Sequence, residues 1–191
     1  MDLRLWGDRE SFLGIPNKRL EASQVPALNP LMVMLLIPLM NLLYNLCDRA
    51  GVRTTPLRRV TVGMFITALS FVATAMLQLY IDAAAAAGAP NSIWIGWQII
   101  QYLIITVGEV MVSITGLEFA YTQAPKKMKS TVMGFWLLTV TLGNVLVAFL
   151  AGFKGLSPAN FFWVFAGLSG GAALIFAVRA YFYVPKDYTQ E

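Results

Sequence analysis

The chain has 191 residues, of which 58% are hydrophobic and 13% are charged, whereas soluble domains carry about a quarter charged residues. A core of this size cannot hide so much apolar surface, so the composition excludes a soluble globular domain. The formal net charge is +4, but the basic residues cluster between apolar runs and form no stripe that would fit nucleic acid, so no nucleic-acid partner is expected.

Five apolar segments follow one another, each near the length of about 20 residues that crosses a bilayer. They lie near 28–47, 58–81, 94–122, 130–152 and 160–184. All five are expected to be helices, because a backbone in lipid must satisfy its own hydrogen bonds. The sequence therefore predicts an all-helical integral membrane protein with a five-helix region at 28–184, an extracytoplasmic segment at 1–27 and a cytoplasmic tail at 185–191.

The basic residues predict the orientation. Seven of them lie in the connectors after the first and third spans, and only Lys154 lies in the second and fourth connectors. Lysine and arginine favour cytoplasmic loops, so the first and third connectors and the C-terminus are expected inside, with the N-terminus outside. A five-span chain that starts outside with no signal-peptide pattern favours a fragment of a longer protein.

The first span begins with the pair Asn29-Pro30. An asparagine at a span boundary is usually a helix cap or an interfacial group. Gln24 and Asn29 also fit an outward extension of the same helix, which would place Asn29 deeper than the edge of the apolar run implies. Sequence alone leaves both interpretations open.

The third span carries an acidic residue near its middle. Glu109 lies close to the midpoint of 94–122, where an ionised carboxylate costs at least about 2.5 kcal/mol. Thr106, Ser113 and Gly116 share its helical face. A polar stripe with a small residue is typical of a helix that lines a substrate cavity. The alternative is a protonated Glu109 that hydrogen-bonds a neighbouring helix and serves only packing.

Glu118 lies farther along the same span, toward the predicted cytoplasmic end. At about 1.5 Å per residue it is roughly 14 Å from Glu109, and Lys126 and Lys129 lie in the connector that follows. This arrangement favours a structural or gate-forming ion pair over a contact with substrate.

The last two spans carry packing signals. Trp136 lies well inside the fourth span rather than at a membrane interface, where tryptophan is usual, and periodicity alone favours packing for it over a cavity-facing position. Gly167 and Gly171 form a pair of small residues four apart in the fifth span, which predicts close packing between helices.

Three runs of sequence resemble one family, the proton-coupled oligopeptide transporters of the major facilitator superfamily. The run GEVMVSITGLEFAYTQAPKKMKSTVMGFWLLT resembles their tenth and eleventh helices, ALNPLMVMLLIPLMNLLY their eighth and TPLRRVTVGMFITALSFVATAMLQ their ninth. The resemblance covers nearly the whole chain from about Gln24. It implies a fold of two six-helix halves, of which this chain supplies helices eight to twelve.

The resemblance also implies roles for individual residues. Glu109 matches the acid of helix ten that receives the amino terminus of a peptide, and Ser113 matches the serine one turn below it. Asn29 matches the helix-eight asparagine that also serves the amino end. Trp136 matches the helix-eleven tryptophan of a side-chain pocket, which favours a cavity-facing position. A di- or tripeptide is then the substrate, with the proton as coupling ion and no cofactor.

Two departures from the family pattern limit what this chain can do. Pro26 stands where family members often have glutamine, and Gln24 lies two residues earlier. The coupling acids and arginine of the first helix, the lysine of the fourth helix and the whole seventh helix are absent. Since alternating access needs both halves, this chain alone is not expected to transport.

The sequence therefore supports one main hypothesis and two weaker ones. The main hypothesis is the C-terminal portion of a di- or tripeptide symporter in the cell membrane, lacking its N-terminal half. The alternative is a non-transporting membrane subunit that binds a partner membrane protein. An intramembrane hydrolase would need a nucleophile paired with a base, and with one cysteine, Cys47, and no histidine the sequence offers no such pair, so an enzyme is not expected.

Overall fold

The structure is a computed structural model of the chain, and it describes residues 11–12, 15–16, 28–51, 54–88, 96–152 and 157–184. Within these ranges it contains the helices α1 (Leu28–Arg49), α2 (Pro56–Ala86), α3 (Gly96–Thr122), α4 (Lys129–Ala151) and α5 (Pro158–Tyr181). A short 3-10 helix, η3 (Lys126–Met128), leads into α4. The two-residue strands β1 (Ser11–Phe12) and β2 (Ile15–Pro16) pair antiparallel.

The five predicted spans are confirmed as helices that are long and apolar enough to cross a membrane. The largest difference is at the end of the second span, which was expected at 81, whereas α2 continues to Ala86. The extension runs through an alanine stretch, and alanine has the highest helix propensity. Gln24, Pro26, most of the expected extracytoplasmic segment and the expected tail at 185–191 lie outside the described residues.

Local sequence explains where two of the helices begin. Thr55 precedes Pro56 at the start of α2, and Ser157 precedes Pro158 at the start of α5. Proline is favoured at the first helical position because its missing N–H would have no helical partner there. The Ser157 hydroxyl oxygen also accepts a hydrogen bond from the backbone N–H of Asn160 at 3.3 Å, which caps α5.

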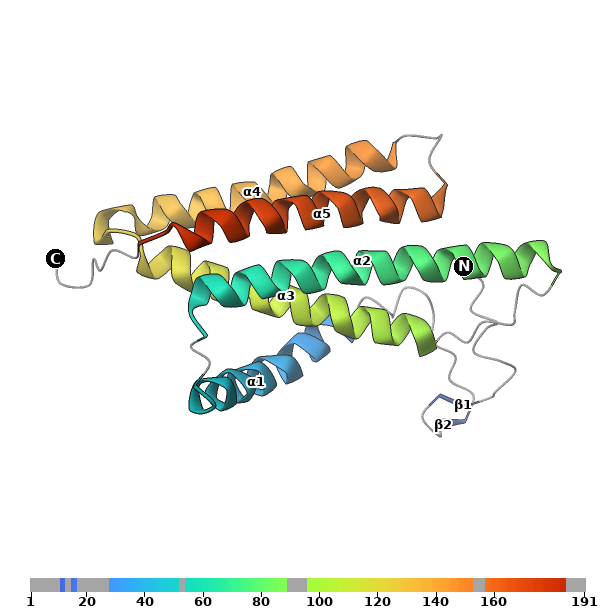
Figure 1. The fold of residues 1–191 in the computed structure, drawn as a ribbon, viewed down its shortest axis with the longest axis horizontal. Helices are drawn as coiled ribbons and strands as arrows, with labels where there is room; N and C mark the ends of the chain where they lie inside the picture. The colour runs from blue at the N-terminus through green and yellow to red at the C-terminus, as the bar shows by residue number, and fades with distance from the viewer. Residues whose placement is uncertain are drawn as a thin grey trace.

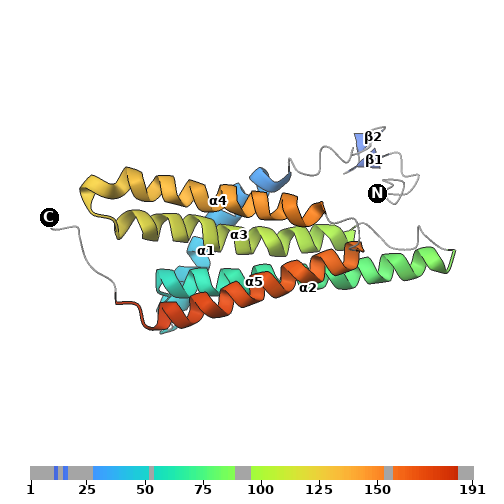
Figure 2. The ribbon, with the colours of Figure 1, turned by 90° about the horizontal axis from the view of Figure 1, so that it is seen from above.

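The helices are arranged around α2 and α3 (Figures 1 and 2). α2 packs against both α5 and α3, and α1 and α4 each contact α3. Figure 2 shows α4 running beside α3, and α5 running beside α2. α3, which carries Glu109, is therefore the helix that α1, α2 and α4 all touch.

The packing of α1 on α3 sets the position of the candidate site. Leu36, Met40 and Tyr44 are buried at intervals of four residues along α1, and they form a core cluster with Val110 and Met111 of α3. Residues four apart lie on one helical face, so this stripe fixes how α1 is rotated. The same face brings the beginning of α1 against the middle of α3.

α4 differs from the other helices because none of its residues is buried. Phe135, Leu137 and Phe149 are each 64% exposed, although all three are large and apolar. Apolar surface of this extent is unsuited to water and fits contact with lipid or with further protein.

Candidate functional site

The structure brings Glu109 of α3 and Asn29 of α1 together, although they are 80 positions apart in the sequence. The Asn29 amide nitrogen Nδ2 donates a hydrogen bond to Glu109 Oε2 at 3.2 Å. Among the described residues, none donates a hydrogen bond to the other carboxylate oxygen, Oε1, and the Glu109 side chain is exposed. One oxygen is thus held by α1, while the other faces an open side of the helix bundle.

Thr106, a buried residue of α3, contacts Asn29 and extends this hydrogen-bonded pair. Its side chain is 0% exposed. The Thr106 hydroxyl lies 3.2 Å from Asn29 Oδ1 and 2.7 Å from the backbone carbonyl oxygen of Tyr102. A buried hydroxyl needs such partners, because an unsatisfied buried polar group is costly. Thr106, Asn29 and Glu109 are therefore linked by hydrogen bonds that run from the buried side of α3 to its exposed side.

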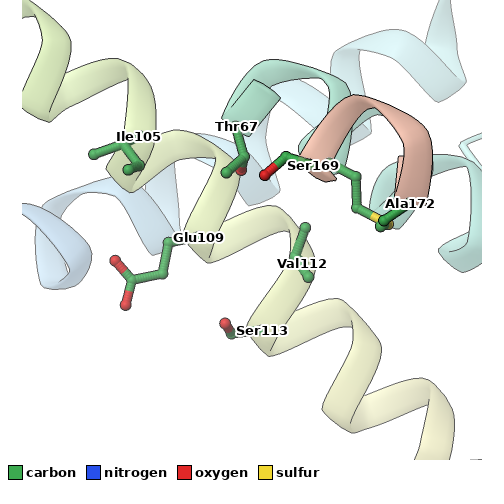
Figure 3. Close-up of a pocket in the computed structure, with 8 residues that line it drawn as sticks. Thr67, Ile105, Glu109, Val112, Ser113, Ser169 and Ala172 are labelled. Atoms are coloured by element: carbon green, nitrogen blue, oxygen red, sulfur yellow. The ribbon is translucent and has the colours of Figure 1, made fainter. Parts of the chain in front are cut away.

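A cavity of about 410 Å³ lies beside Glu109, between α2, α3 and α5. Its lining is Met64, Thr67, Ile105, Glu109, Val112, Ser113, Ser169 and Ala172. Figure 3 shows the Glu109 carboxylate and the Ser113 hydroxyl pointing to the same side of α3, away from Thr67 and Ser169. Glu109 and Ser113 therefore form a polar rim on a mostly apolar cavity.

Trp136 of α4 lies over Gly116 of α3. A side chain on Gly116 would bring its Cβ to 2.6 Å from the Trp136 ring, so the indole fills the notch that the glycine leaves. Gly116 is three residues beyond Ser113 on the helical face that Glu109 also occupies. Trp136 is not among the residues that line the cavity, and its proposed contact with a peptide side chain stays a prediction.

The expected pairing of Glu118 with Lys126 or Lys129 is not formed in the described part of the chain. The Lys129 ammonium instead lies 4.2 Å from the centre of the Tyr121 ring, where a cation is attracted to the aromatic face. Glu118 and Lys126 are exposed. A gate pair between these residues stays a prediction.

Sequence reasoning missed a polar network at the end of the bundle where α1 passes into α2. Asp48 Oδ1 accepts hydrogen bonds from the backbone N–H of Thr54 at 2.9 Å and from its hydroxyl at 2.8 Å. Arg59 donates to the Thr54 carbonyl oxygen at 2.9 Å and lies over the Tyr44 ring, 4.0 Å from its centre. These contacts tie the connector to both helices.

Thr67 and Ser169 were also missed as cavity residues. Each is a single hydroxyl in an apolar helix, and hydroxyls in helices commonly bond the backbone one turn earlier, as Thr67 does with the Gly63 carbonyl oxygen at 3.0 Å. The sequence therefore carried no signal that separated them from other hydroxyl residues. No group of histidine, cysteine, aspartate and glutamate in the described ranges could hold a metal ion.

Comparison with known proteins decides the family. The profile of the PTR2 family, described as the POT family, matches residues 13–164. The chain belongs to the POT family. This match confirms the predicted resemblance. Family membership and the five apolar helices together show that the chain is a multi-pass membrane protein.

Solved structures confirm the predicted all-helical fold of the major facilitator type. The POT family chain superposes on the crystal structure of an auto-inhibited POT family peptide transporter with a TM-score of 0.76 and 40% identity, covering 99% of this chain and 38% of that one. For the POT family transporter PepTSo the TM-score is 0.74 and the identity 40%, covering 93% of this chain and 36% of that one.

Curated relatives are members of solute carrier family 15. The chain is 50% identical over 100 residues to solute carrier family 15 member 2 of Danio rerio, covering 52% of this chain and 14% of that protein. It is 45% identical over 122 residues to the Rattus norvegicus protein of the same name, covering 63% of this chain and 17% of that one. The matched region is thus less than a fifth of each relative.

Proposed function

We propose that this POT family chain forms the C-terminal portion, helices eight to twelve, of a proton-coupled symporter for di- and tripeptides. Glu109 is the residue that binds the amino group of the peptide. The observation that carries the proposal is the Glu109 carboxylate in the middle of a membrane span. One oxygen is held by Asn29, and the other, which accepts no hydrogen bond from the described residues, faces an open side of the bundle.

The chemistry of the site fits a peptide amino group. An ammonium carries three N–H donors, and a carboxylate accepts such hydrogen bonds at roughly twice the strength of a neutral acceptor. In the proposed complete transporter the other helices would enclose this exposed face, and the attraction between the two charges would then be greater than in water. Ser113 adds a hydroxyl one turn away, and Trp136 offers an aromatic wall for a peptide side chain once α4 faces the rest of the transporter.

The remaining helices are part of the proposal. The chain spans 38% or less of the transporters and relatives described above, and alternating access requires two halves that rock against each other. We therefore expect no transport by these five helices alone. The proton is the coupling ion and no cofactor takes part, and because transport leaves the peptide chemically unchanged, no catalytic residue is assigned.

The location follows from the same proposal. The chain resides in the cell membrane, with the connector after α1 and the η3 turn in the cytoplasm and the N-terminal segment outside. The alternative of a non-transporting subunit has no observation in its favour within the described residues.

The test compares peptides with free and acetylated amino groups. The chain is placed behind the first seven helices of a POT family relative, and inhibition of reporter-peptide uptake gives the apparent affinities. Glu109→Gln removes the charge but keeps the size, so it should weaken binding of free-amino peptides about 10- to 100-fold, the equivalent of a charge-assisted hydrogen bond. Binding of acetylated peptides should change little.

Glu118→Gln is the matched control, because Glu118 is the other acid of α3 and is also exposed. This variant should leave the preference for a free amino group intact. An equal loss of both peptide classes in Glu109→Gln would remove the amino-binding role from Glu109.

A further inference from the structure

The Thr106 hydroxyl has one hydrogen and two acceptors beside it. Its oxygen lies 2.7 Å from the Tyr102 carbonyl oxygen and 3.2 Å from Asn29 Oδ1, and a hydroxyl donates to one acceptor at a time. The shorter distance favours Tyr102, one helical turn earlier, which is the usual partner of a threonine in a helix. Among the described residues, the Asn29 amide oxygen is therefore held by one long, shared hydrogen bond.

In the structure the donor end of the Asn29 amide faces Glu109. A bare carboxylate only accepts hydrogen bonds, so the donor end of the amide, Nδ2, turns to Glu109 and lies 3.2 Å from Oε2. In this orientation the amide nitrogen gives the carboxylate an N–H donor, which is what a peptide amino group would also offer. The acceptor end of the amide faces Thr106 and is not available to substrate.

A half-turn of the Asn29 amide about its last side-chain bond exchanges the hydrogen bond to Glu109 for an unshared one to Thr106. Nδ2 then donates to the Thr106 oxygen, and Thr106 keeps its own hydrogen on the Tyr102 carbonyl, so each donor has an acceptor. Oδ1 now faces Glu109. Two acceptors side by side repel each other unless a cation lies between them, and an ammonium supplies both the charge and the donors.

We propose that Thr106 is a positioning residue of the amino-group site. Its buried hydroxyl accepts a hydrogen bond from the turned Asn29 amide and thereby presents Oδ1, beside Glu109, to the primary ammonium of a peptide. This role rests on the function proposed above and adds to it a residue that does not itself touch the peptide.

The experiment removes the hydroxyl and keeps the shape. Thr106→Val in the completed transporter should weaken binding of free-amino peptides about 3- to 10-fold, since one neutral hydrogen bond is lost from the loaded site. Binding of acetylated peptides and the maximal uptake rate should stay within about twofold. Thr106→Ser keeps the hydroxyl and should restore the affinity. Thr106→Ala repeats the test with a smaller side chain if Thr106→Val does not reach the membrane.

Two further variants separate positioning from packing. Thr115→Val removes a hydroxyl from a threonine of α3 that is only 7% exposed, and it should leave the amino-group preference unchanged. In an Asn29→Ala background, Thr106→Val should cause no additional loss, because Thr106 acts through Asn29. Additive losses, or a loss shared by acetylated peptides, would overturn the positioning role.

The outcome also separates this inference from the proposed function. If Glu109→Gln does not lose the preference for a free amino group, the amino-binding function itself is wrong. If Glu109→Gln loses that preference and Thr106→Val keeps it, the function stands and the role of Thr106 is wrong.

Discussion

Gly108, the residue before Glu109, lies where α2 and α3 approach each other closely. A Cβ on Gly108 would collide with the Thr67 hydroxyl and lie 3.0 Å from the Gly63 carbonyl oxygen. A Cβ on Gly63 would in turn lie 2.6 Å from Met111 Cβ. The two glycines therefore let the helix backbones touch. This contact fixes how α3 is rotated against α2, and so the direction in which the Glu109 side chain points.

We predict that Gly108→Val destabilises the bundle by about 1–3 kcal/mol, because the added methyl groups force α2 and α3 apart. The measurement is the thermal unfolding midpoint in detergent, followed by circular dichroism. Gly143→Val in α4 is the matched control, since a Cβ there meets nothing within 4 Å. Equal midpoints for the two variants would contradict a tight crossing at Gly108.

Single residues differ in how far the sequence could predict their positions. Glu109 was found because a carboxylate in an apolar span is costly and therefore conspicuous. The close-packing glycines were not found, because Gly63 and Gly108 look like any other glycine until the partner helix is placed. Gly167 and Gly171 show the reverse: their spacing predicted packing, yet in the described chain a Cβ at either meets nothing within 4 Å.

At the scale of whole helices, α5 packs on α2 through alanines. Ala68 and Ala75 are buried on α2, seven residues apart, and Ala159, Ala166 and Ala173 are buried on α5 at the same interval. A seven-residue repeat keeps one face of each helix toward its partner, and small side chains let helices in a membrane come close. The contact between α2 and α5 thus includes these alanines and the ring pair of Phe71 and Phe165, whose centroids are 5.7 Å apart, but not the predicted glycine pair.

We predict that Ala75→Leu loosens this contact. Ala75 is 0% exposed. The three additional carbon atoms of leucine therefore have no space there and should push α2 and α5 apart. Hydrogen exchange of α2 and α5 backbone amides, measured by mass spectrometry in detergent, should become faster. Ala83→Leu places the same side chain at an exposed position of α2 and should leave exchange unchanged. Unaltered protection in Ala75→Leu would mean that the alanine face does not carry the contact.

The sequence predicted the helices better than their contacts, for one physical reason. An apolar segment in lipid is helical because its backbone must satisfy its own hydrogen bonds. The lengths of the apolar segments and helix-breaking residues such as Pro56 and Gly88 therefore predict where the helices begin and end. The same uniform apolarity removes the amphipathic stripe that marks the packed face of a soluble helix. Which side of α5 meets α2 could not be predicted from hydropathy.

At the scale of the whole molecule, the connectors separate into two ends. Figure 1 shows the turn from α1 to α2 and the η3 turn at one end of the bundle, with the end of α2 and the beginning of α5 at the other. The first end carries Asp48, Thr54 and Arg59 in one hydrogen-bonded network. The division of basic residues along the sequence agrees with these two ends, which is why the orientation could be proposed without a structure.

Cysteine labelling on intact cells tests this orientation. Cys47→Ser removes the single cysteine, and Ala87→Cys or Lys127→Cys then adds one at an exposed position on each side. We expect a membrane-impermeant maleimide to label Ala87→Cys on intact cells, because the proposed topology places the connector after α2 outside the cell. Lys127→Cys should be labelled only after permeabilisation, since lysine-rich connectors remain in the cytoplasm. The opposite pattern would invert the proposed topology and place the N-terminal segment inside the cell.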